Sequence, residues 1–455
     1  MSQLSRREWL LTAPATASLA QRRAPSKQPN VIVFVADDLG VRDLGCLGAA
    51  DMRTPHLDAL AASGALFSNW YSNAPVCAPA RSSILTGKFP QNAGVPNNGL
   101  ELAPGQLTIA EMLRPRGYAT ACIGKWHLGD TPATDPNGHG FDSFYGFRSG
   151  CVDFYSHRYY WGETRKVNYH DLWRNRTEIF EDGRYLTERI TEEALEFIRA
   201  QRARPFFAYV AYNAVHYPMH APARYVNRFA GLEPERRVYG AMLAAMDDGI
   251  GEIRKTLKDT GLLENTLTFF VGDNGATTEK RAGLNQQYAA GGRNGNFRGF
   301  KFSLFDGGMH VPGMVSWPAA IPAGQKIDEL VMSMDILPTV CAAAGAAPPT
   351  GYQVDGRDIL PVAAARGKSP HEAIFWASSG QTAVRRGKWK LVRDGRTYDR
   401  SPEGAKPLTG EDAVFLSDLE ADPGETRNLR RANPNLVDEL STLIDKWSAT
   451  LPPSK

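Results

Sequence analysis

Unbroken apolar runs that end in pairs of polar residues are the main pattern in this chain. The run NVIVFVADDLG ends in Asp37 and Asp38, and ENTLTFFVGDNGAT repeats the arrangement, with Leu267–Val271 followed by Asp273 and Asn274. A continuous β-branched and apolar run predicts a strand that is buried on both faces of a parallel or mixed sheet. Because ligands of open α/β sheets bind beyond the carboxyl ends of the strands, both polar pairs are expected at one edge of the sheet.

These two strand ends form a candidate metal site. Asp37, Asp38, Asp273 and Asn274 offer three carboxylates and one amide with no soft ligand. Such a set suits Ca²⁺ or Mg²⁺, and a flexible cage of oxygen atoms favours Ca²⁺. The alternative is that Asp-Gly and Asp-Asn-Gly are simple turns. The recurrence of the same ending on two strands favours the metal site.

Other segments alternate between strand and helix patterns. Strands are expected at 118–123, with Lys125 and His127 after it, and at 206–212, followed by His216. Apolar residues at helical spacing predict helices over 107–116, 185–201 and 239–262. This alternation predicts an α/β fold, with a large mixed sheet sandwiched between helices. Asp, Lys, His and Asn at four strand ends favour one shared site over isolated surface residues.

The last part of the chain predicts a smaller unit. Short strand patterns at 371–378, 382–394 and 414–422 indicate an antiparallel sheet, and 432–451 indicates an amphipathic helix that starts near Asn433 or Asn435. We therefore expect residues 28–368 to form a catalytic domain and residues 369–455 a C-terminal subdomain of sheet and helix. Residues 1–27 are expected to be a disordered export segment.

Composition and charge exclude some partners and suggest a compartment. The 455 residues are 42% hydrophobic and 22% charged, as in ordinary globular proteins, and a net charge of +3 does not argue for a nucleic-acid partner. No apolar run is long enough to cross a bilayer. Arg6 and Arg7 precede a short Ala-rich stretch, which resembles a twin-arginine export signal with cleavage after Ala20. Periplasmic or extracellular localisation follows as an expectation; a disordered tail is the alternative.

The stretch SNAPVCAPARSSILTG is unusual because it places Cys77 between Pro75 and Pro79. The prolines predict an exposed turn that leads into a helix, capped by Ser82 or Ser83. A cysteine at a helix start beside Arg81 is expected to be in an electropositive, reactive setting. None of the five cysteines forms a C-x-x-C pair, so no zinc or thioredoxin-like motif is indicated, and disulfide pairing stays open.

Ordered sequence blocks resemble the sulfatase family. CAPARSSILTGKFP fits its C-x-P-x-R signature and GKWHLG its second signature, while VIVFVADDLG, FFVGDNG, AVHYPMHAPARYVNRF and RGFKFSLFDGGMHVP resemble further blocks, as does the tail AVRRGKWKLV. The resemblance spans about residues 30–447. Within the family, the chain is similar to the formylglycine-dependent, arylsulfatase B-like branch. This resemblance implies an alkaline-phosphatase-like fold and the hydrolysis of sulfate esters.

The resemblance also implies roles for individual residues. It implies that a maturation enzyme oxidises Cys77 to formylglycine, whose hydrated aldehyde would attack sulfur and later expel sulfate. The implied ligands of one Ca²⁺ are Asp37, Asp38, Asp273, Asn274 and the modified Cys77. Arg81 and Lys125 are expected to hold the diol, and His127 to take its proton. His216 and Lys301 are expected to bind sulfate and assist the leaving oxygen.

Substrate contacts are the least determined part of this prediction. The segment at 146–190 resembles the branch that acts on sulfated amino sugars, and it contains Asp153, His157, Tyr159, Tyr160 and Trp161. Interleaved aromatic and polar residues suit a sugar-binding rim, although such a loop can also simply pack on its own domain. His310 stands where many family members carry arginine; it either alters packing or makes substrate binding depend on pH.

Two other functions compete with a carbohydrate sulfatase. The first is a phosphonate monoester or phosphodiester hydrolase on the same scaffold, which also uses formylglycine. The second is an inactive protein that only binds carbohydrate sulfate. All the expected catalytic residues are present in this chain, which argues against the inactive protein.

Overall fold

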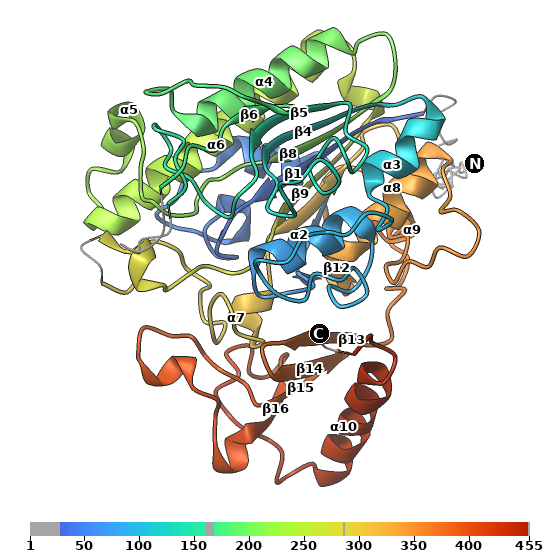
Figure 1. The fold of residues 1–455 in the computed structure, drawn as a ribbon. Helices are drawn as coiled ribbons and strands as arrows, with labels where there is room; N and C mark the ends of the chain where they lie inside the picture. The colour runs from blue at the N-terminus through green and yellow to red at the C-terminus, as the bar shows by residue number, and fades with distance from the viewer. Residues whose placement is uncertain (1–27, 161–167, 285–286, 454–455) are drawn as a thin grey trace, which may run out of the picture.

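The computed structural model describes residues 28–453, apart from 161–167 and 285–286. A ten-stranded sheet crosses the larger part of the molecule, and a four-stranded sheet lies below it in Figure 1. The strand order of the large sheet is β11-β2-β10-β9-β1-β8-β4-β5-β6-β7. Its strands are β1 (Asn30–Ala36), β2 (Ala65–Phe67), β4 (Ala119–Lys125), β5 (Ser143–Phe147), β6 (Trp173–Arg174), β7 (Thr177–Glu178), β8 (Phe206–Ala211), β9 (Thr266–Gly272), β10 (Gly313–Ser316) and β11 (Gln325–Ile327). A separate pair joins β3 (Trp70–Tyr71) to β12 (Val331–Met332).

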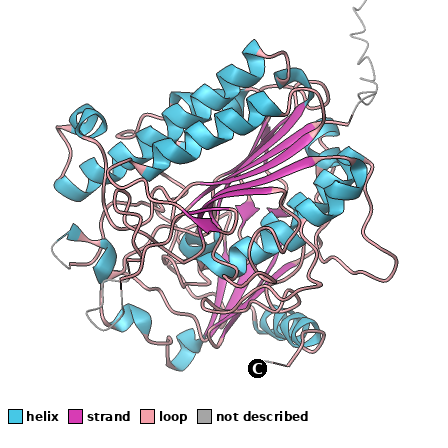
Figure 2. Cartoon of the chain, turned by 45° about the horizontal axis from the view of Figure 1, so that its top comes forward, coloured by secondary structure: helices cyan, strands magenta, loops and turns pink. Residues whose placement is uncertain are grey.

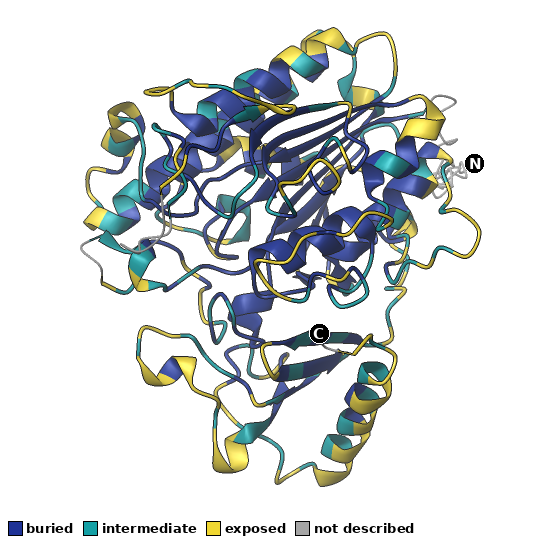
Figure 3. Cartoon of the chain, in the orientation of Figure 1, coloured by how far each residue is buried: buried dark blue, intermediate teal, exposed yellow. Residues whose placement is uncertain are grey.

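Strand β1 lies at the centre of the large sheet, parallel to β8 on one side and to β9 on the other. Its side chains alternate between the two faces: Ile32 and Phe34 belong to one core cluster, and Val31, Val33 and Val35 to the other. Every residue of β1 is buried, as Figure 3 shows for the central strands. Because both faces are covered, the strand reads as an unbroken apolar run. The predicted α/β architecture is confirmed.

Helices cover both faces of the sheet (Figures 1 and 2). Helices α4 and α6 contribute to one apolar cluster, and α2, α3 and α8 contribute to the other. The helices are α1 (Pro55–Ala62), α2 (Cys77–Thr86), α3 (Ile109–Leu113), α4 (Leu186–Ala200), α5 (Ala223–Val226), α6 (Pro234–Asp259), α7 (Asp306–Met309), α8 (Ile336–Ala344), α9 (Leu360–Ala365) and α10 (Pro434–Ser448). The helices predicted over 185–201 and 239–262 correspond to α4 and α6.

Three predicted boundaries differ from the structure. Helix α2 begins at Cys77 itself, not after Ser82, because Pro79 falls in its first turn, where the missing N–H is not needed. The helix predicted over 107–116 is α3 followed by one 3₁₀ turn at Arg114–Arg116, which contains Pro115. Strand β4 continues through Lys125, so this lysine is its last residue.

The four-stranded sheet is antiparallel and lies near the C-terminus. It consists of β13 (Ile374–Ser378), β14 (Gln381–Arg386), β15 (Trp389–Arg393) and β16 (Val414–Asp418). The stretch at 382–394 that predicted one strand is a hairpin, because Gly387 adopts a φ of +57° between β14 and β15. Helix α10 packs on one face through Leu440 and Ile444. The boundary at residue 368 stays a prediction, and it falls between α9 and β13.

The other face of the small sheet contacts the large domain through an ion pair and a hydrogen bond. Lys390 of β15 is fully buried and lies 2.6 Å from a carboxylate oxygen of Asp306 in α7. The indole N–H of Trp376 donates to the carbonyl oxygen of Ser72 at 2.8 Å. The hydroxyl of Ser72 donates in turn to the carbonyl oxygen of Asp273. The small sheet therefore supports the loop that carries one of the predicted metal ligands.

Candidate active site

The carboxyl ends of β1 and β9 bring the two predicted polar pairs together. These strands are parallel neighbours, and Ala36 is in register with Gly272, so the residues that follow them are adjacent. The main-chain N–H of Asp38 donates to Asp273 Oδ1 at 3.1 Å, and Asn274 Nδ2 donates to Asp38 Oδ1 at 2.7 Å. Four side chains that predicted a metal site thus form one buried cluster: Asp37, Asp38, Asp273 and Asn274.

Cys77 faces this cluster from the first position of α2. Its Sγ lies 3.5 Å from Asp37 Oδ1 and 4.0 Å from Asp38 Oδ1, and the residue is only 1% exposed. The exposed turn predicted here is wrong, since all residues of α2 are buried. Burial raises the pKa of Cys77, so the unmodified thiol is not an activated nucleophile in this environment. All five cysteines lie among the described residues, and each is free of a disulfide.

Three buried cations surround the carboxylates. Lys125 Nζ lies 2.7 Å from Asp37 Oδ2, and Lys301 Nζ lies 2.9 Å from Asp38. Arg81 donates to Asp273 Oδ2 through Nε at 3.0 Å and Nη2 at 2.8 Å. Buried charges of both signs in direct contact compensate one another, which makes their burial tolerable. The cluster is therefore a densely charged site in the interior of the protein.

The carboxylates have different protonation preferences. Burial opposes ionisation of Asp37, but the charges of Lys125, Arg81 and Lys301 outweigh it and lower the pKa. Burial raises the pKa of Asp38 to about 7, and the neighbouring acids add to the rise. Burial likewise raises the pKa of Asp273, and the charge of Asp37 adds to that effect. An additional positive charge beside these acids would favour their ionised forms.

The oxygen atoms at this edge fit a divalent cation. Asn274 Oδ1 is buried and has no hydrogen-bond partner, although the amide Nδ2 of the same side chain is paired. A buried acceptor without a donor is unfavourable unless a ligand occupies it. One oxygen each of Asp37 and Asp38 lies within 4.8 Å of Cys77 Sγ, in a group that also contains His216. The hard oxygen donors among these residues match Ca²⁺.

Burial and nearby cations disfavour the protonated form of both predicted catalytic histidines, because they lower the pKa of each ring. His216 Nδ1 lies 2.8 Å from the carbonyl oxygen of Tyr217 and therefore carries the hydrogen, while Nε2 faces Lys301 Nζ at 3.4 Å. Burial, together with the charges of Lys301 and Lys125, lowers the pKa of His216 well below its ordinary value. Burial and the charges of Lys125 and Arg81 do the same to His127. Lys301 is thus the charged donor on its side of the site.

Two residues that the sequence did not indicate shape this geometry. Glu279 lies 3.5 Å from Lys301 Nζ and also pairs with Arg281, so it shares with Asp38 the balancing of the Lys301 charge. Gly150 lies against His127: a Cβ atom there would be 2.7 Å from His127 Nε2. Neither residue belongs to a motif, and their roles arise only when distant segments meet.

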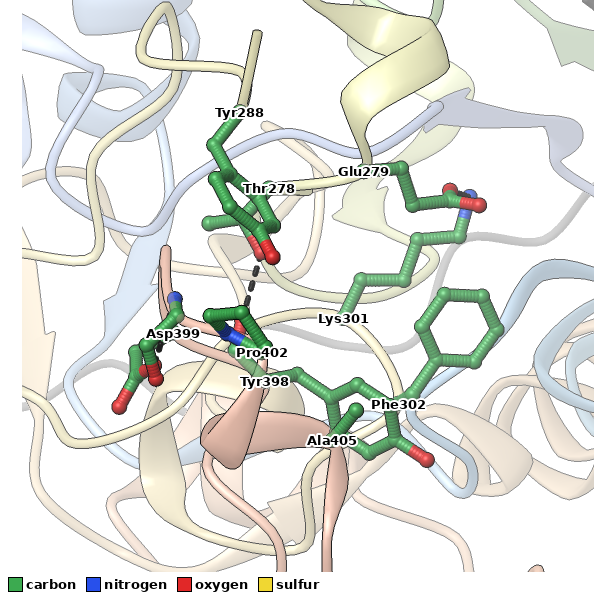
Figure 4. Close-up of a pocket in the computed structure, with 10 residues that line it drawn as sticks. Thr278, Glu279, Tyr288, Lys301, Phe302, Tyr398, Asp399, Pro402 and Ala405 are labelled. Carbon is green, nitrogen blue, oxygen red and sulfur yellow. Dashed lines mark hydrogen bonds and ion pairs between the residues drawn. The ribbon is translucent and has the colours of Figure 1, made fainter.

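Two cavities adjoin the catalytic residues. One, of about 200 Å³, is lined by Lys301, Glu279, Tyr288 and Tyr398, and Figure 4 shows the Lys301 and Glu279 side chains meeting at one end of it. The other, of about 400 Å³, reaches His127. Its wall combines aromatic and acidic side chains with one arginine: Glu101, Asp130, Arg148, Tyr169, Asp171 and Trp173. This second cavity has the size of a small-molecule site.

The predicted substrate residues contact other groups of the protein itself. Asp153 accepts from the N–H groups of Tyr155 and Ser156 and pairs with His220. His157 is buried and lies 3.0 Å from the carbonyl oxygen of Arg184. His310 stacks on Tyr71 and lies 2.7 Å from the carbonyl oxygen of Ser68, as a packing residue does. Their substrate roles stay predictions. Tyr159 stacks on Tyr169, which lines the larger cavity, and Trp161 is outside the described residues.

Comparisons with known proteins agree with this geometry. The family profile described as Sulfatase matches residues 29–346. N-acetylgalactosamine-6-sulfatase of Canis lupus familiaris is 31% identical, covering 98% of this chain and 90% of the relative, and steryl-sulfatase of Rattus norvegicus is 32% identical, covering 89% and 85%. A solved structure entitled Ps i-CgsB in complex with k-i-k-neocarrahexaose has a TM-score of 0.80 and 29% identity, covering 93% of each chain.

The fold and the site therefore define a hydrolase of alkaline-phosphatase-like fold, with a charged centre for anionic esters. The chain belongs to the sulfatase family and is a sulfuric ester hydrolase. The family prediction is confirmed, and the narrower resemblance to arylsulfatase B stays a prediction.

Proposed function

We propose that this chain removes sulfate from a sulfated carbohydrate, with formylglycine formed from Cys77 and one Ca²⁺ held by Asp37, Asp38, Asp273 and Asn274. The observation that carries this proposal is the position of Cys77, buried at a helix start against two carboxylates and surrounded by three cations. The hydrated aldehyde supplies a hydroxyl nucleophile, and Ca²⁺ supplies positive charge beside it.

Other residues of the chain stabilise charge, accept a proton and donate a hydrogen bond in the proposed reaction. Lys125 and Arg81 stabilise negative charge next to position 77, because both are buried and fixed by carboxylates. Neutral His127 is able to accept a proton from the group at that position. Lys301 donates a hydrogen bond to the leaving oxygen. His216 Nε2 accepts from Lys301 and so orients its ammonium group.

The larger cavity is the proposed saccharide site. Tyr169 and Trp173 offer apolar faces for a sugar ring, and Glu101 and Asp130 offer acceptors for its hydroxyl groups. The chemistry of a neutral ring with hydroxyl groups fits this wall better than that of a second anion. Replacement of Trp173 by Ala is expected to raise KM for a sulfated saccharide while leaving turnover of a small aryl sulfate nearly unchanged. Equal losses on both substrates would contradict a saccharide contact at Trp173.

Export and maturation complete the proposal. The twin-arginine-like segment around Arg6 and Arg7 lies outside the described residues, and it supports a periplasmic or extracellular location by sequence alone. Among residues 28–453, leaving aside 161–167 and 285–286, no helix combines the length and apolarity that crossing a bilayer requires. A formylglycine-generating enzyme is the partner that conversion of Cys77 requires.

The test begins with mass spectrometry of the peptide that contains Cys77, which should show the thiol replaced by an aldehyde. The converted protein is then assayed on aryl sulfate, aryl phosphonate, steryl sulfate and a panel of defined sulfated saccharides. Preferential turnover of one saccharide is the expected result. Preference for the phosphonate would favour the phosphonate hydrolase. No turnover by fully converted protein would indicate a binding protein, and activity with the unmodified thiol would refute the mechanism.

A further inference from the structure

A second group of metal-ligating side chains lies apart from the catalytic carboxylates. His157, His170 and Asp182 each offer one ligand atom, and these three atoms lie within 4.8 Å of one another. The two histidines are 0% and 8% exposed, whereas the Asp182 side chain is 59% exposed. The group thus combines two buried nitrogen donors with one carboxylate at the surface.

The backbone brings these residues together from three segments. The main-chain N–H of Asp171 donates to the carbonyl oxygen of His157 at 2.9 Å, and Arg158 pairs with His170 in an antiparallel bridge. The two imidazole rings therefore come from neighbouring bridged segments and meet at 81°, with centroids 6.3 Å apart. Asp182 follows in the turn that leads to α4, whose first residue is Leu186.

Hydrogen bonds at the far side of each ring determine which nitrogen is free. His157 Nε2 lies 3.0 Å from the carbonyl oxygen of Arg184, and His170 Nδ1 lies 3.1 Å from Glu178 Oε1. Both partners only accept, so these nitrogens carry the hydrogens. The opposite nitrogens, His157 Nδ1 and His170 Nε2, hold lone pairs, are buried and have no hydrogen-bond partner.

An imidazole whose remote N–H is held by a carbonyl or carboxylate is oriented for metal binding. Buried acceptors without donors are unfavourable in the absence of a ligand. Asp182 does not remove this deficit, since its oxygen is 3.9 Å from His170 Nε2, beyond hydrogen-bond distance.

We propose that His157 Nδ1, His170 Nε2 and a carboxylate oxygen of Asp182 bind one Zn²⁺ ion, with water as the fourth ligand. Two imidazoles and one carboxylate suit zinc, whereas Ca²⁺ prefers a set of oxygen atoms alone. Zinc bonds of about 2.0–2.2 Å place neighbouring ligand atoms within about 3.5 Å, so the three atoms, now within 4.8 Å of one another, would draw together on binding, and exposed Asp182 has room to rotate. Its exposure also provides the entry path for the ion.

This ion would stabilise the position of residues that line the larger cavity. His170 lies between Tyr169 and Asp171, which both line that cavity. Asp171 in turn accepts from the main-chain N–H groups of Arg148 and Ser149. The proposed site therefore holds His157 against the stretch at 169–171 without taking part in sulfate hydrolysis, and it does not depend on the proposed substrate.

The test measures zinc uptake by the full chain with the catalytic site saturated by Ca²⁺. Protein stripped with a zinc-selective chelator is incubated with Zn²⁺, desalted and analysed by inductively coupled plasma mass spectrometry, and affinity is measured against a chromophoric zinc indicator. Wild type should bind one Zn²⁺ per chain. Asp182→Asn should weaken binding by at least about tenfold, and His170→Ala should abolish it. Co²⁺ in the same site should show intense visible d–d bands that these variants lose.

Asp248→Asn is the matched control, because Asp248 belongs to a different group with His56 and Asp247. It should keep the zinc stoichiometry of the wild type. The exposed Asp182 side chain can be changed without disturbing the fold, so the test holds even if His170→Ala fails to fold. No bound zinc in wild type, equal affinity in Asp182→Asn, or loss of zinc in Asp248→Asn would each overturn the proposal.

Discussion

Gly150 offers a direct test of how closely the position of His127 controls catalysis. A Cβ at residue 150 would lie 2.7 Å from His127 Nε2 and 2.9 Å from Cε1, distances that side chains do not tolerate. The atoms it meets belong to a rigid ring, and His127 itself has a φ of +60°, so its backbone has little freedom to adapt. Gly150 has no left-handed φ, which makes alanine acceptable to the backbone at this position.

The expected effect follows from the size of this overlap. Restoring a contact of about 3.5 Å requires the ring to move by about 0.8 Å. Displacement of a catalytic group by about 1 Å costs about 100-fold in rate. We therefore expect Gly150→Ala to lower kcat by between about tenfold and 100-fold, or about 1.4 to 2.7 kcal/mol of transition-state stabilisation. Stability should change by less than about 1 kcal/mol, since alanine also restricts the unfolded chain.

The assay compares kcat of Gly150→Ala with that of Gly231→Ala, in which the new Cβ meets no atom within 4 Å. Conversion of Cys77 is measured by mass spectrometry in both variants, so that a maturation defect is not read as a catalytic one. Circular dichroism melting curves report folding. A Gly150→Ala variant with wild-type kcat at equal conversion would refute the argument that this contact positions His127.

Three further predictions concern the histidines, the metal and one remote acid. His216→Ala should be partly rescued by substrates with better leaving groups, whereas His127→Ala should not, because only the former acts where the alcohol departs; equal rescue would contradict these roles. Exhaustive chelation should abolish activity and lower Tm, since ligand at 100-fold its Kd stabilises by about 2.7 kcal/mol; unchanged activity would exclude the metal. Burial raises the pKa of Asp247 to about 6 from 3.8. Its protonated form is thus favoured in the folded state, and stability should fall as pH rises from about 4 through about 6, by about 3 kcal/mol at most. Denaturant melts of Asp247→Asn should lack this fall, and the same slope in wild type and variant would refute it.

The positions of the strands could be predicted from the sequence more accurately than the first residues of the helices. Continuous apolar runs predicted β1 and β9 because central parallel strands are buried on both faces. The start of α2 was predicted from capping residues, but neither Ser82 nor Ser83 caps it, and the helix begins at Cys77. Local propensity could not reveal this, since tertiary packing around the charged cluster fixes where α2 begins.

The sequence indicated which residues are candidates for the site better than it indicated which atoms contact one another there. Motif resemblance named Arg81 as a residue that holds the group at position 77, but it did not indicate the two hydrogen bonds from its guanidinium to Asp273. Gly150 and Glu279 carry no local signal, because their importance arises from the approach of His127 and Lys301 across the fold. Contacts between residues that are distant in sequence depend on topology, which periodicity does not specify.

The pairing of β1 with late strands has a consequence for the order of synthesis. Strand β1 is completed by β8 and β9, and β9 starts at Thr266, 189 residues after Cys77. At translation rates of about 5–20 residues per second, roughly 10–40 s pass between the appearance of these two positions. The thiol of Cys77, which is buried in the folded protein, is accessible during this interval. The maturation enzyme that we propose for Cys77 would therefore compete with folding, and slower translation or slower β9 pairing would increase the fraction of molecules that it converts.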